Sequence, residues 1–377
     1  MISLNALWRN LSNKLFSIKN KIINLWDKDE KSLSFFNKII LYFLFIFEFF
    51  YKIFFQGFIF WNKNFGKPLK TNFKVISIGN ISCGGTGKSV LARYLIENIK
   101  AKGAILLRGY KSQNEKTGKS FLVSDGNNIF CKSDFCGDEA FMLASSLKIP
   151  VVIGKNRSKS VDLLNNLGCN YLVLDDAYQN FALKKDYEIL LLDARNPFGN
   201  NHCLPAGPLR EKDINRADII IFTHADEIDD KKRLELKRGI KKQNIFFGKH
   251  ALSFFMNSEM KRFLIDDFES KRFVAFAGIG SFSGFCRSLE KTKINLVKSI
   301  EFEDHHQYSI QEVIKILEIS DSLDAFGVIT TLKDWVKICN FFSELDPKLL
   351  KKIYFLDISF DFLNKEEEIL FFNLIKI

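Results

Sequence analysis

The sequence predicts a doubly wound α/β fold, and three observations carry this prediction. Short, continuously apolar runs recur along the middle of the chain, as expected of parallel strands covered on both faces. Helical stretches separate most of these runs, which is the order of β-α-β units. The first run leads into a glycine-rich turn and then a helical pattern, in VISIGNISCGGTGKS at residues 75–89. Ligands of such sheets bind beyond the carboxyl ends of the strands, so a site is expected there.

Six strands of the sheet are predicted from apolar runs. They are Val75–Ile78, Ala104–Leu107, Val151–Ile153, Tyr171–Leu174, Ile189–Leu192 and Ile219–Phe222. A helix is predicted over Val90–Ile99, where apolar residues recur with helical periodicity. Residues 252–257 and 261–268 have the character of two short strands that join two lobes, with a boundary near residue 250.

The turn after the first strand has the composition of a phosphate-binding loop. Its first position is Ser82, where the usual pattern has glycine, and it closes with Lys88 and Ser89. Backbone N–H groups of the turn and of the following helix form a positive concavity for phosphate oxygens. The lysine reaches the β- and γ-phosphates, and the serine hydroxyl ligates Mg²⁺. The sequence therefore predicts a P-loop NTPase-type fold that binds a nucleoside triphosphate through Ser82, Gly84, Gly85, Thr86, Gly87, Lys88 and Ser89.

The sequence contains two pairs of candidate carboxylates, one directly after the fourth predicted strand and one at the start of a predicted helix. Asp175 and Asp176 come directly after Tyr171–Leu174, where an acidic group of a nucleotide site holds Mg²⁺ or its water shell. Asp138 and Glu139 precede a helical stretch, so capping that helix is an alternative to a catalytic role. Helix capping is also an alternative for Asp175 and Asp176, but the phosphate loop at residues 82–89 favours a role in the nucleotide site for them.

Two further segments carry candidate substrate contacts. Arg157 follows the strand Val151–Ile153, where it could clamp a phosphate, although surface arginines are common. Residues 200–211 contain two of the six prolines and end in Arg210 and Glu211. A loop stiffened in this way beside a nucleotide site favours substrate positioning.

Composition limits the setting of the protein. The 377 residues allow more than one domain. Seven scattered cysteines without zinc-site spacing are typical of a reduced, cytosolic protein. The net charge of +11 is concentrated in residues 1–74, which hold twelve Lys and Arg against four Asp and Glu. A basic, apolar N-terminal segment ahead of a nearly neutral body favours an anionic membrane surface over nucleic acid as the partner.

Residues 39–61 are long and apolar enough to cross a bilayer. Their polar members Glu48, Lys52 and Gln56 are four residues apart and share one helical stripe. A spanning helix would bury that stripe in lipid, whereas a helix in the interface leaves it facing water or protein. We therefore predict a membrane-surface helix, with a spanning helix and then a core helix as alternatives. Residues 1–30 have the pattern of an additional basic amphipathic helix.

One segment allows a different class of function. Thr223-His224-Ala225-Asp226 follows the last predicted strand and loosely matches the guanine-reading turn of regulatory GTPases, with histidine in place of lysine. Under that hypothesis the chain is a membrane-associated P-loop GTPase switch. A membrane scaffold that only binds nucleotide is a third possibility.

Nine separated segments in the same order resemble the tetraacyldisaccharide 4′-kinase family of the lipid A pathway in Gram-negative bacteria. They are GNISCGGTGKS (79–89), LRGYKS (107–112), GDEAFMLA (137–144), VIGKNR (152–157), LDDAYQN (174–180), LPAGPLRE (204–211), AFAGIG (275–280), DHHQYS (304–309) and TTLKD (330–334). The resemblance implies transfer of the ATP γ-phosphate to the 4′-hydroxyl of a tetraacylated glucosamine disaccharide 1-phosphate. It implies a helix on the cytoplasmic face of the inner membrane, and a smaller C-terminal α/β domain that closes over the nucleotide.

The resemblance also implies roles for individual residues. Lys88 and Ser89 match the phosphate-loop pair of the family, and Asp175 and Asp176 match its magnesium carboxylates. Asp138 matches the aspartate that takes the proton from the sugar hydroxyl, and His305 matches the histidine that supports it. The residues that match the lining of the reaction site are Glu139, Arg157, Gln179, Arg210 and Glu211. We expect ATP and Mg²⁺ as cofactors, no nucleic acid partner and a monomer, divided into residues 1–74, 75–250 and 251–377.

The chain departs from the family pattern at three positions. Asn180 stands where the family usually has histidine, Leu332 where it has glutamate and Lys111 where it has glycine. The first argues against a role for a side-chain imidazole near the metal carboxylates, although asparagine keeps both a donor and an acceptor. The other two lie outside the predicted core of the site.

Overall fold

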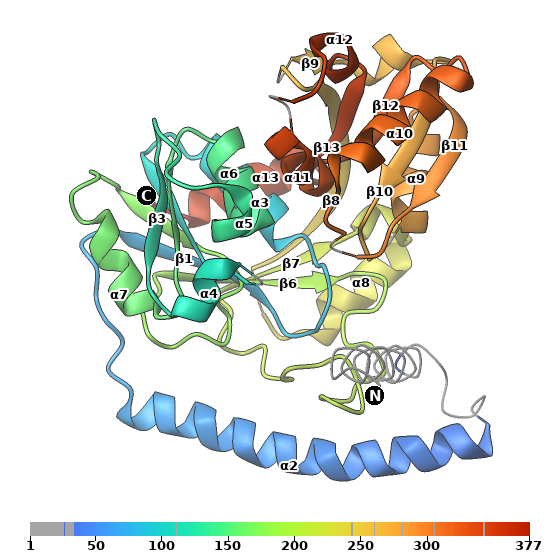
Figure 1. The fold of residues 1–377 in the computed structure, drawn as a ribbon. Coiled ribbons are helices and arrows are strands. Elements are labelled where there is room, and N and C mark those ends of the chain that lie inside the picture. The colour runs from blue at the N-terminus through green and yellow to red at the C-terminus, as the bar shows by residue number, and fades with distance from the viewer. Residues whose placement is uncertain are drawn as a thin grey trace, which may run out of the picture. The chain divides into compact units, whose positions relative to one another are not determined.

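A computed structural model of the chain (Figure 1) describes residue 26 and residues 34–377 except Lys111, Gln243, Met260, Ser281, His305, Phe342 and Ser343. The predicted basic helix of residues 1–30 lies outside the described residues, apart from Trp26. The predicted catalytic His305 also lies outside them, as does Lys111.

The chain forms two compact units, each assembled from separated stretches of sequence. The first unit comprises the described part of residues 1–88, with 176–249 and 362–376. The second comprises residues 89–175 and 250–361. The division into residues 1–74, 75–250 and 251–377 stays a prediction.

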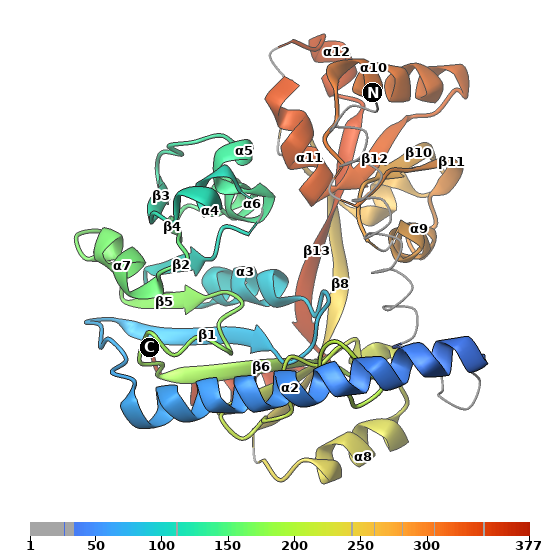
Figure 2. The same cartoon turned by 60° about the horizontal axis from the view of Figure 1, so that its bottom comes forward.

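A parallel sheet organises the first unit. Its strands run in the order β1 (Lys74–Asn80), β6 (Tyr187–Asp193), β7 (Ile219–Thr223) and the first part of β8 (Ile245–Asn257). Figure 2 shows β1 and β6 side by side. The three predicted strands of this unit are confirmed. Each is longer than predicted, by one or two residues at one end or at each end. The unit also contains α8 (Asp230–Gly239), α13 (Lys365–Leu374) and the 3₁₀ turn η3 (Ala225–Glu227).

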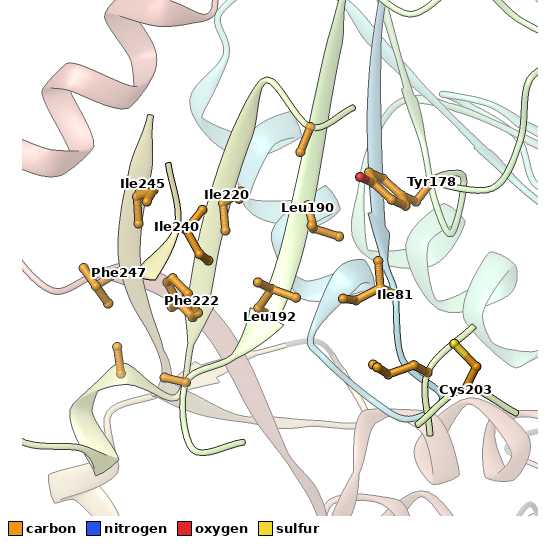
Figure 3. Packing of buried hydrophobic residues seen from close by; sticks show 14 residues of the cluster. Ile81, Tyr178, Leu190, Leu192, Cys203, Ile220, Phe222, Ile240, Ile245 and Phe247 are labelled. Atoms are coloured by element: carbon orange, nitrogen blue, oxygen red, sulfur yellow. The ribbon is translucent and has the colours of Figure 1, made fainter. Parts of the chain in front are cut away.

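Apolar side chains from neighbouring strands fill one face of this sheet (Figure 3). Leu190 and Leu192 come from β6, and Phe222 comes from β7. The ring of Phe222 stacks on that of Phe247 in β8 with centroids 5.4 Å apart. Residues two apart point to the same face of a strand, so this alternation holds the sheet in register. The cluster continues to Ile81, directly after β1, and so fixes the start of the phosphate loop.

The second unit contains two groups of strands. In one group β5 (Tyr171–Leu174), β2 (Gly103–Leu107) and β4 (Pro150–Ile153) are parallel, and β3 (Phe121–Asp125) pairs antiparallel with β4. The strand β3 was not predicted: its apolar run is only three residues long, Phe121–Val123, and polar Ser124 and Asp125 complete the strand. Its helices are α3 (Lys88–Asn98), α4 (Gln113–Thr117), α5 (Ser133–Cys136), α6 (Asp138–Ser146) and α7 (Arg157–Val161).

The other group is parallel in the order β11 (Asn295–Glu301), β10 (Arg272–Ala277), β12 (Gly327–Thr331) and β13 (Ile353–Phe362). Its helices are α9 (Phe282–Glu290), α10 (Ile310–Ser322), α11 (Leu332–Ile338) and α12 (Pro347–Leu350). A buried two-point ion pair joins this group to the helix of the phosphate loop, since Arg93 of α3 donates to both oxygens of Asp357 in β13, at 2.5 and 2.7 Å.

The two short strands predicted near residue 250 have different outcomes. Residues 252–257 lie within β8, as predicted. The strand predicted over 261–268 is wrong beyond β9 (Arg262–Phe263), because a 3₁₀ turn follows at Ile265–Phe268. The carboxylate of Asp267 accepts the N–H of Leu264 at 2.9 Å. Local side-chain capping of this kind competes with strand pairing.

The N-terminal apolar segment forms a single helix, α2 (Phe35–Phe65). Ser34 caps it by accepting the N–H of Asn37. By length and composition α2 could cross a membrane, and only 17% of its most apolar window is buried. The hypothesis of a core helix is therefore wrong. A series of large apolar residues is exposed along α2, including Phe43, Ile46, Phe47, Phe50, Phe54 and Trp61.

Candidate active site

The phosphate loop connects β1 to α3 and is bound at its start by the proline-rich segment. The carbonyl of Ile81 accepts the N–H of Arg210 at 2.6 Å, and Cys83 donates its N–H to the carbonyl of Pro208 at 2.7 Å. Ser82 forms a bridge with Leu209 between these two bonds. The predicted stiff segment 204–211 therefore runs along the loop and holds it from one side.

The loop has the features that a bound phosphate requires. Gly84 and Gly87 have φ values of +129° and +81°, which residues with a Cβ rarely adopt. A Cβ placed on Gly84 or Gly85 would meet no protein atom within 4 Å, so the space beside these residues is open. The hydroxyl of Thr86 is buried and has no hydrogen-bond partner among the described residues. An oxyanion in the open space fits both observations.

The last two loop residues face the two consecutive aspartates. In the first unit, the ammonium of Lys88 lies 3.5 Å from Asp176, which also accepts from Arg210 at 3.1 Å. In the second unit, the hydroxyl of Ser89 donates to Asp175 at 2.9 Å. Burial on its own raises the pKa of Asp176, but the cations of Lys88 and Arg210 outweigh it and lower that pKa below its ordinary value. Asp176 is therefore ionised at neutral pH.

The oxygens of Ser89, Asp175 and Asp176 suit Mg²⁺, which proteins rarely bind through their own side chains alone. The described residues contain no group of three or more His, Cys, Asp or Glu that could hold a metal ion. Ser89, Asp175 and Asp176 offer one hydroxyl and two carboxylates. Mg²⁺ is usually bound in this way, by one or two carboxylates with water and substrate phosphate completing the shell. The residues present fit that ion.

Arg157 is placed inside the second unit and not on its surface. It is buried at the start of α7 and donates through Nη2 to the backbone carbonyl of Asp175 at 2.8 Å. The guanidinium thereby fixes the end of β5, where the predicted metal carboxylates begin.

Both oxygens of Glu211 have protein partners. Arg216 donates to them at 2.7 and 3.0 Å, and the amide of Gln179 donates to Oε1 at 2.9 Å. The same amide donates to the carbonyl of Asn80 at the end of β1. Glu211 and Gln179 therefore connect the phosphate loop to segment 204–211. Arg216 was missed in the sequence, because a spacing of five residues outside a helix gives no signal for an ion pair.

Asp138 and Glu139 begin α6 in the second unit. The residue before them, Gly137, has φ +89°, a conformation that only glycine adopts readily. Two lysines of α11 face the pair, Lys337 at 3.8 Å from Asp138 and Lys333 at 3.1 Å from Glu139. Sequence reasoning missed Lys337, which lies three residues beyond the recognised segment TTLKD.

His306, next to the predicted histidine, and Asn180 both have local partners. His306 lies 3.2 Å from Glu312 of α10 and packs against the rings of Phe302 and Tyr308. Asn180, in place of the usual histidine, accepts the N–H of Ala182 at 3.0 Å and so closes a turn.

His224, in the segment compared with GTPases, has φ +55° and lies 3.4 Å from Glu227. It precedes the 3₁₀ turn η3 and contacts a residue of that turn. In the structure its ring has a local role at the end of β7.

Helix α2 is attached to the segment that flanks the phosphate loop. Glu48 is buried, accepts the N–H of Cys203 at 2.7 Å and lies 2.9 Å from the ring of His202. One turn later, the hydroxyl of Tyr51 donates to the carbonyl of Arg210 at 2.8 Å. The polar stripe predicted on this helix therefore begins with a residue that faces protein.

Comparison with known proteins identifies the family. A family model described as tetraacyldisaccharide-1-P 4′-kinase matches residues 40–373. Tetraacyldisaccharide 4′-kinase of Halothermothrix orenii is 31% identical over 348 residues, covering 87% of this chain and 90% of the relative. The enzyme of Desulfatibacillum aliphaticivorans is 34% identical, covering 74% and 78%. A crystal structure described as the "apo" form of LpxK from Aquifex aeolicus in complex with ATP is 25% identical, with a TM-score of 0.72, covering 89% of this chain and all of that one. The chain belongs to the tetraacyldisaccharide-1-P 4′-kinase family.

Proposed function

We propose that this chain is a kinase that transfers the γ-phosphate of ATP to the 4′-hydroxyl of a tetraacylated glucosamine disaccharide 1-phosphate, a step of lipid A biosynthesis. The observation that carries the proposal is the pairing of consecutive loop residues with consecutive aspartates, Lys88 with Asp176 and Ser89 with Asp175. Family membership supplies the acceptor, a lipid disaccharide. It also favours a kinase over the alternative of a GTPase switch.

In this proposal the cations of the site neutralise the triphosphate. Lys88 exchanges part of its contact with Asp176 for the γ-phosphate, and Arg210 remains beside that carboxylate. Ser89, Asp175 and Asp176 would hold Mg²⁺, which would supply further charge neutralisation to the triphosphate. Phosphoryl transfer depends on positioning and charge stabilisation more than on covalent help from the protein, and these groups provide both.

Asp138 accepts the proton of the sugar hydroxyl in this proposal, supported by His305. Glu139 lies beside it at the start of α6. Arg157, Gln179 and Glu211 act by holding the strand ends and segment 204–211, since their contacts are with protein groups. Arg210 is the member of the predicted lining that is placed against both the phosphate loop and Asp176.

The membrane surface is the proposed location of the enzyme. Helix α2 could anchor it through its exposed apolar residues, because contiguous exposed apolar surface of this extent marks an interaction site. We propose that α2 lies on the cytoplasmic face of the inner membrane, where ATP is available, and that the enzyme acts there as a monomer without a nucleic acid partner.

Direct assay tests the proposed reaction. Purified full-length protein is incubated with Mg-ATP and the acylated disaccharide 1-phosphate, and the lipid is analysed by mass spectrometry. The expected product is a 1,4′-bisphosphorylated lipid, formed with ATP and not with GTP. Hydrolysis of GTP without any phosphorylated lipid would instead support the switch hypothesis.

Removing apolar side chains from the exposed face of α2 should weaken membrane binding and leave the nucleotide site intact. Phe43, Phe47 and Phe54 are exposed and lie away from the polar contacts of Glu48 and Tyr51. Each buried phenylalanine contributes ~1.5 kcal/mol or more, so changing all three to serine should weaken vesicle binding at least ~10²-fold. Co-sedimentation with anionic lipid vesicles measures this, and the KM for ATP should not change.

Salt and carbonate washes distinguish a helix on the membrane surface from a helix that spans the membrane. High salt should release part of the bound protein, because attraction of exposed basic residues to anionic lipid is screened over ~10 Å at 0.1 M salt. Full retention in cell membranes after high-salt and alkaline carbonate washes would contradict the surface location.

A further inference from the structure

Helix α11 contains a buried carboxylate that several donors hold in place. Asp334 is fully buried in the second unit and accepts the N–H of Gly278 at 3.1 Å and the hydroxyl of Thr331 at 2.7 Å. Gly278 lies in segment AFAGIG and Thr331 in segment TTLKD. These two segments have no part in the phosphate site described above. Asp334 therefore joins two recognised segments of the chain that still lack a role.

A buried lysine extends from this carboxylate toward α6. The ammonium of Lys337 lies 3.1 Å from Asp334 and 3.8 Å from Asp138, and only 4% of its side chain is exposed. Burying an ammonium is costly unless it is paired, and here Asp334 supplies the hydrogen-bonded partner. One turn earlier on the same face, Lys333 lies 3.1 Å from Glu139. Two lysines of α11 thus face the two acidic residues that begin α6.

Lys337 forms a hydrogen bond with only one of the two carboxylates that it faces. At 3.1 Å the contact with Asp334 has hydrogen-bond length, whereas 3.8 Å to Asp138 is too long for one. Lys337 therefore attracts the Asp138 carboxylate electrostatically, without a hydrogen bond between the two. A general base must be held in position relative to the proton that it accepts, and attraction to a buried cation can hold it there.

The charge balance also favours this arrangement. Two carboxylates surround one ammonium, so the group carries one net negative charge before proton transfer and none after it. The ring centroid of Tyr308 lies 5.9 Å from the same ammonium. Burial, with the Asp334 carboxylate close by, raises the pKa of the Tyr308 hydroxyl, which stays neutral. The only charged partners of Lys337 among the described ion pairs are the two aspartates.

We propose that Lys337, held by Asp334, is the positioning residue of Asp138: it keeps the carboxylate directed for accepting the proton of the acceptor hydroxyl. This inference rests on the proposed function, in which Asp138 is the proton acceptor. It assigns a purpose to segments AFAGIG and TTLKD, which hold Asp334 and thereby Lys337.

Steady-state kinetics of full-length Lys337→Met and Lys337→Arg test the inference. Misplacing a catalytic group by about 1 Å costs up to ~10²-fold in rate, so Lys337→Met should lower kcat by ~10-fold to 10²-fold. The KM for ATP should remain within about twofold, because the nucleotide contacts are elsewhere. Lys337→Arg keeps the cation and should recover part of kcat. Lys352→Met is the matched control, since Lys352 is paired with Asp321 in the same unit, and it should keep the native rate.

A double-mutant cycle with Asp138→Asn separates positioning from mere stability. Lys337→Met should slow the native enzyme and have almost no effect in the Asp138→Asn background, because its target carboxylate is then absent. Equal losses in both backgrounds would overturn the inference while leaving Asp138 as the base. A native rate for Asp138→Asn alone would overturn the base assignment, and this inference with it.

Folding is checked separately, because Lys337→Met leaves Asp334 buried without its cation. The paired variant Asp334→Asn/Lys337→Met removes both buried charges and keeps an oxygen for the N–H of Gly278. If Lys337→Met does not fold, the paired variant replaces it in the cycle, with the same expected and contradicting results.

Discussion

Replacing Lys88 with alanine is expected to abolish detectable kinase activity in a protein that still folds. In the proposed function Lys88 is the loop cation that follows the γ-phosphate, and in the structure it lies 3.5 Å from Asp176. Loss of one preorganised charge that contacts the transition state typically costs ~10²–10³-fold in rate. Its loss should not disturb the core, because the loop is fixed by backbone bonds of Ile81 and Cys83 to segment 208–210. Bisphosphorylated lipid formed per unit time is the measurement.

The control for Lys88→Ala is Lys74→Ala. Lys74 begins β1 in the same unit, is half-exposed and lies 3.5 Å from Asp186, the same separation as the Lys88 pair. Its loss should leave the rate unchanged, and thermal unfolding should show both variants folded. Undiminished activity of folded Lys88→Ala would overturn the assignment of the phosphate loop.

Replacing Asp138 with asparagine should lower kcat by at least ~10²-fold, the usual contribution of general base catalysis. Asparagine keeps the size of the side chain and suits the start of a helix, so α6 should form normally. It cannot accept the proton of the acceptor hydroxyl at neutral pH. The measurement is kcat at saturating ATP and lipid, with the KM for ATP as the internal check on binding.

The histidines test the same assignment. His305→Ala should also slow the reaction, and its effect should combine less than additively with Asp138→Asn if the two residues act as a unit. His306→Ala is the comparison, because His306 packs against Phe302 and Tyr308 and contacts Glu312. Its loss should lower the melting temperature more than the rate. A larger rate loss for His306→Ala than for His305→Ala would mean that His306, and not His305, is the functional histidine.

The sequence was most informative where one local pattern determines one element. Tyr171–Leu174 is a fully buried strand, and its continuously apolar run gives its bounds correctly as β5. The loop at 82–89 follows from glycines and a lysine at fixed spacing, and Ser89 contacts Asp175 as the motif implies. In contrast, β3 is a partly buried edge strand that pairs antiparallel with β4, and its apolar run Phe121–Val123 is followed at once by Ser124 and Asp125. It was missed although that run is as long as Val151–Ile153.

Contacts between distant side chains were beyond sequence reasoning. Glu211 was predicted to line the reaction site, yet both its oxygens are bonded to Arg216 or Gln179. The burial of Lys337 between Asp334 and Asp138 depends on how α11 packs against α6. A lysine in a sequence is most often solvated. Only the fold reveals which lysine is paired inside.

The attachment of α2 through Glu48 and Tyr51 has a consequence for enzyme design. These residues bind the backbone at Cys203 and Arg210, and the Arg210 backbone in turn bonds to the start of the phosphate loop. Helix α2 therefore supports the segment that holds the phosphate loop, in addition to its proposed role as a membrane anchor. A chimaera in which an unrelated amphipathic peptide replaces α2 would restore residence on the bilayer without restoring the support behind Arg210. Transplanting the kinase to a soluble format would require grafting Glu48 and Tyr51 onto whatever replaces the helix.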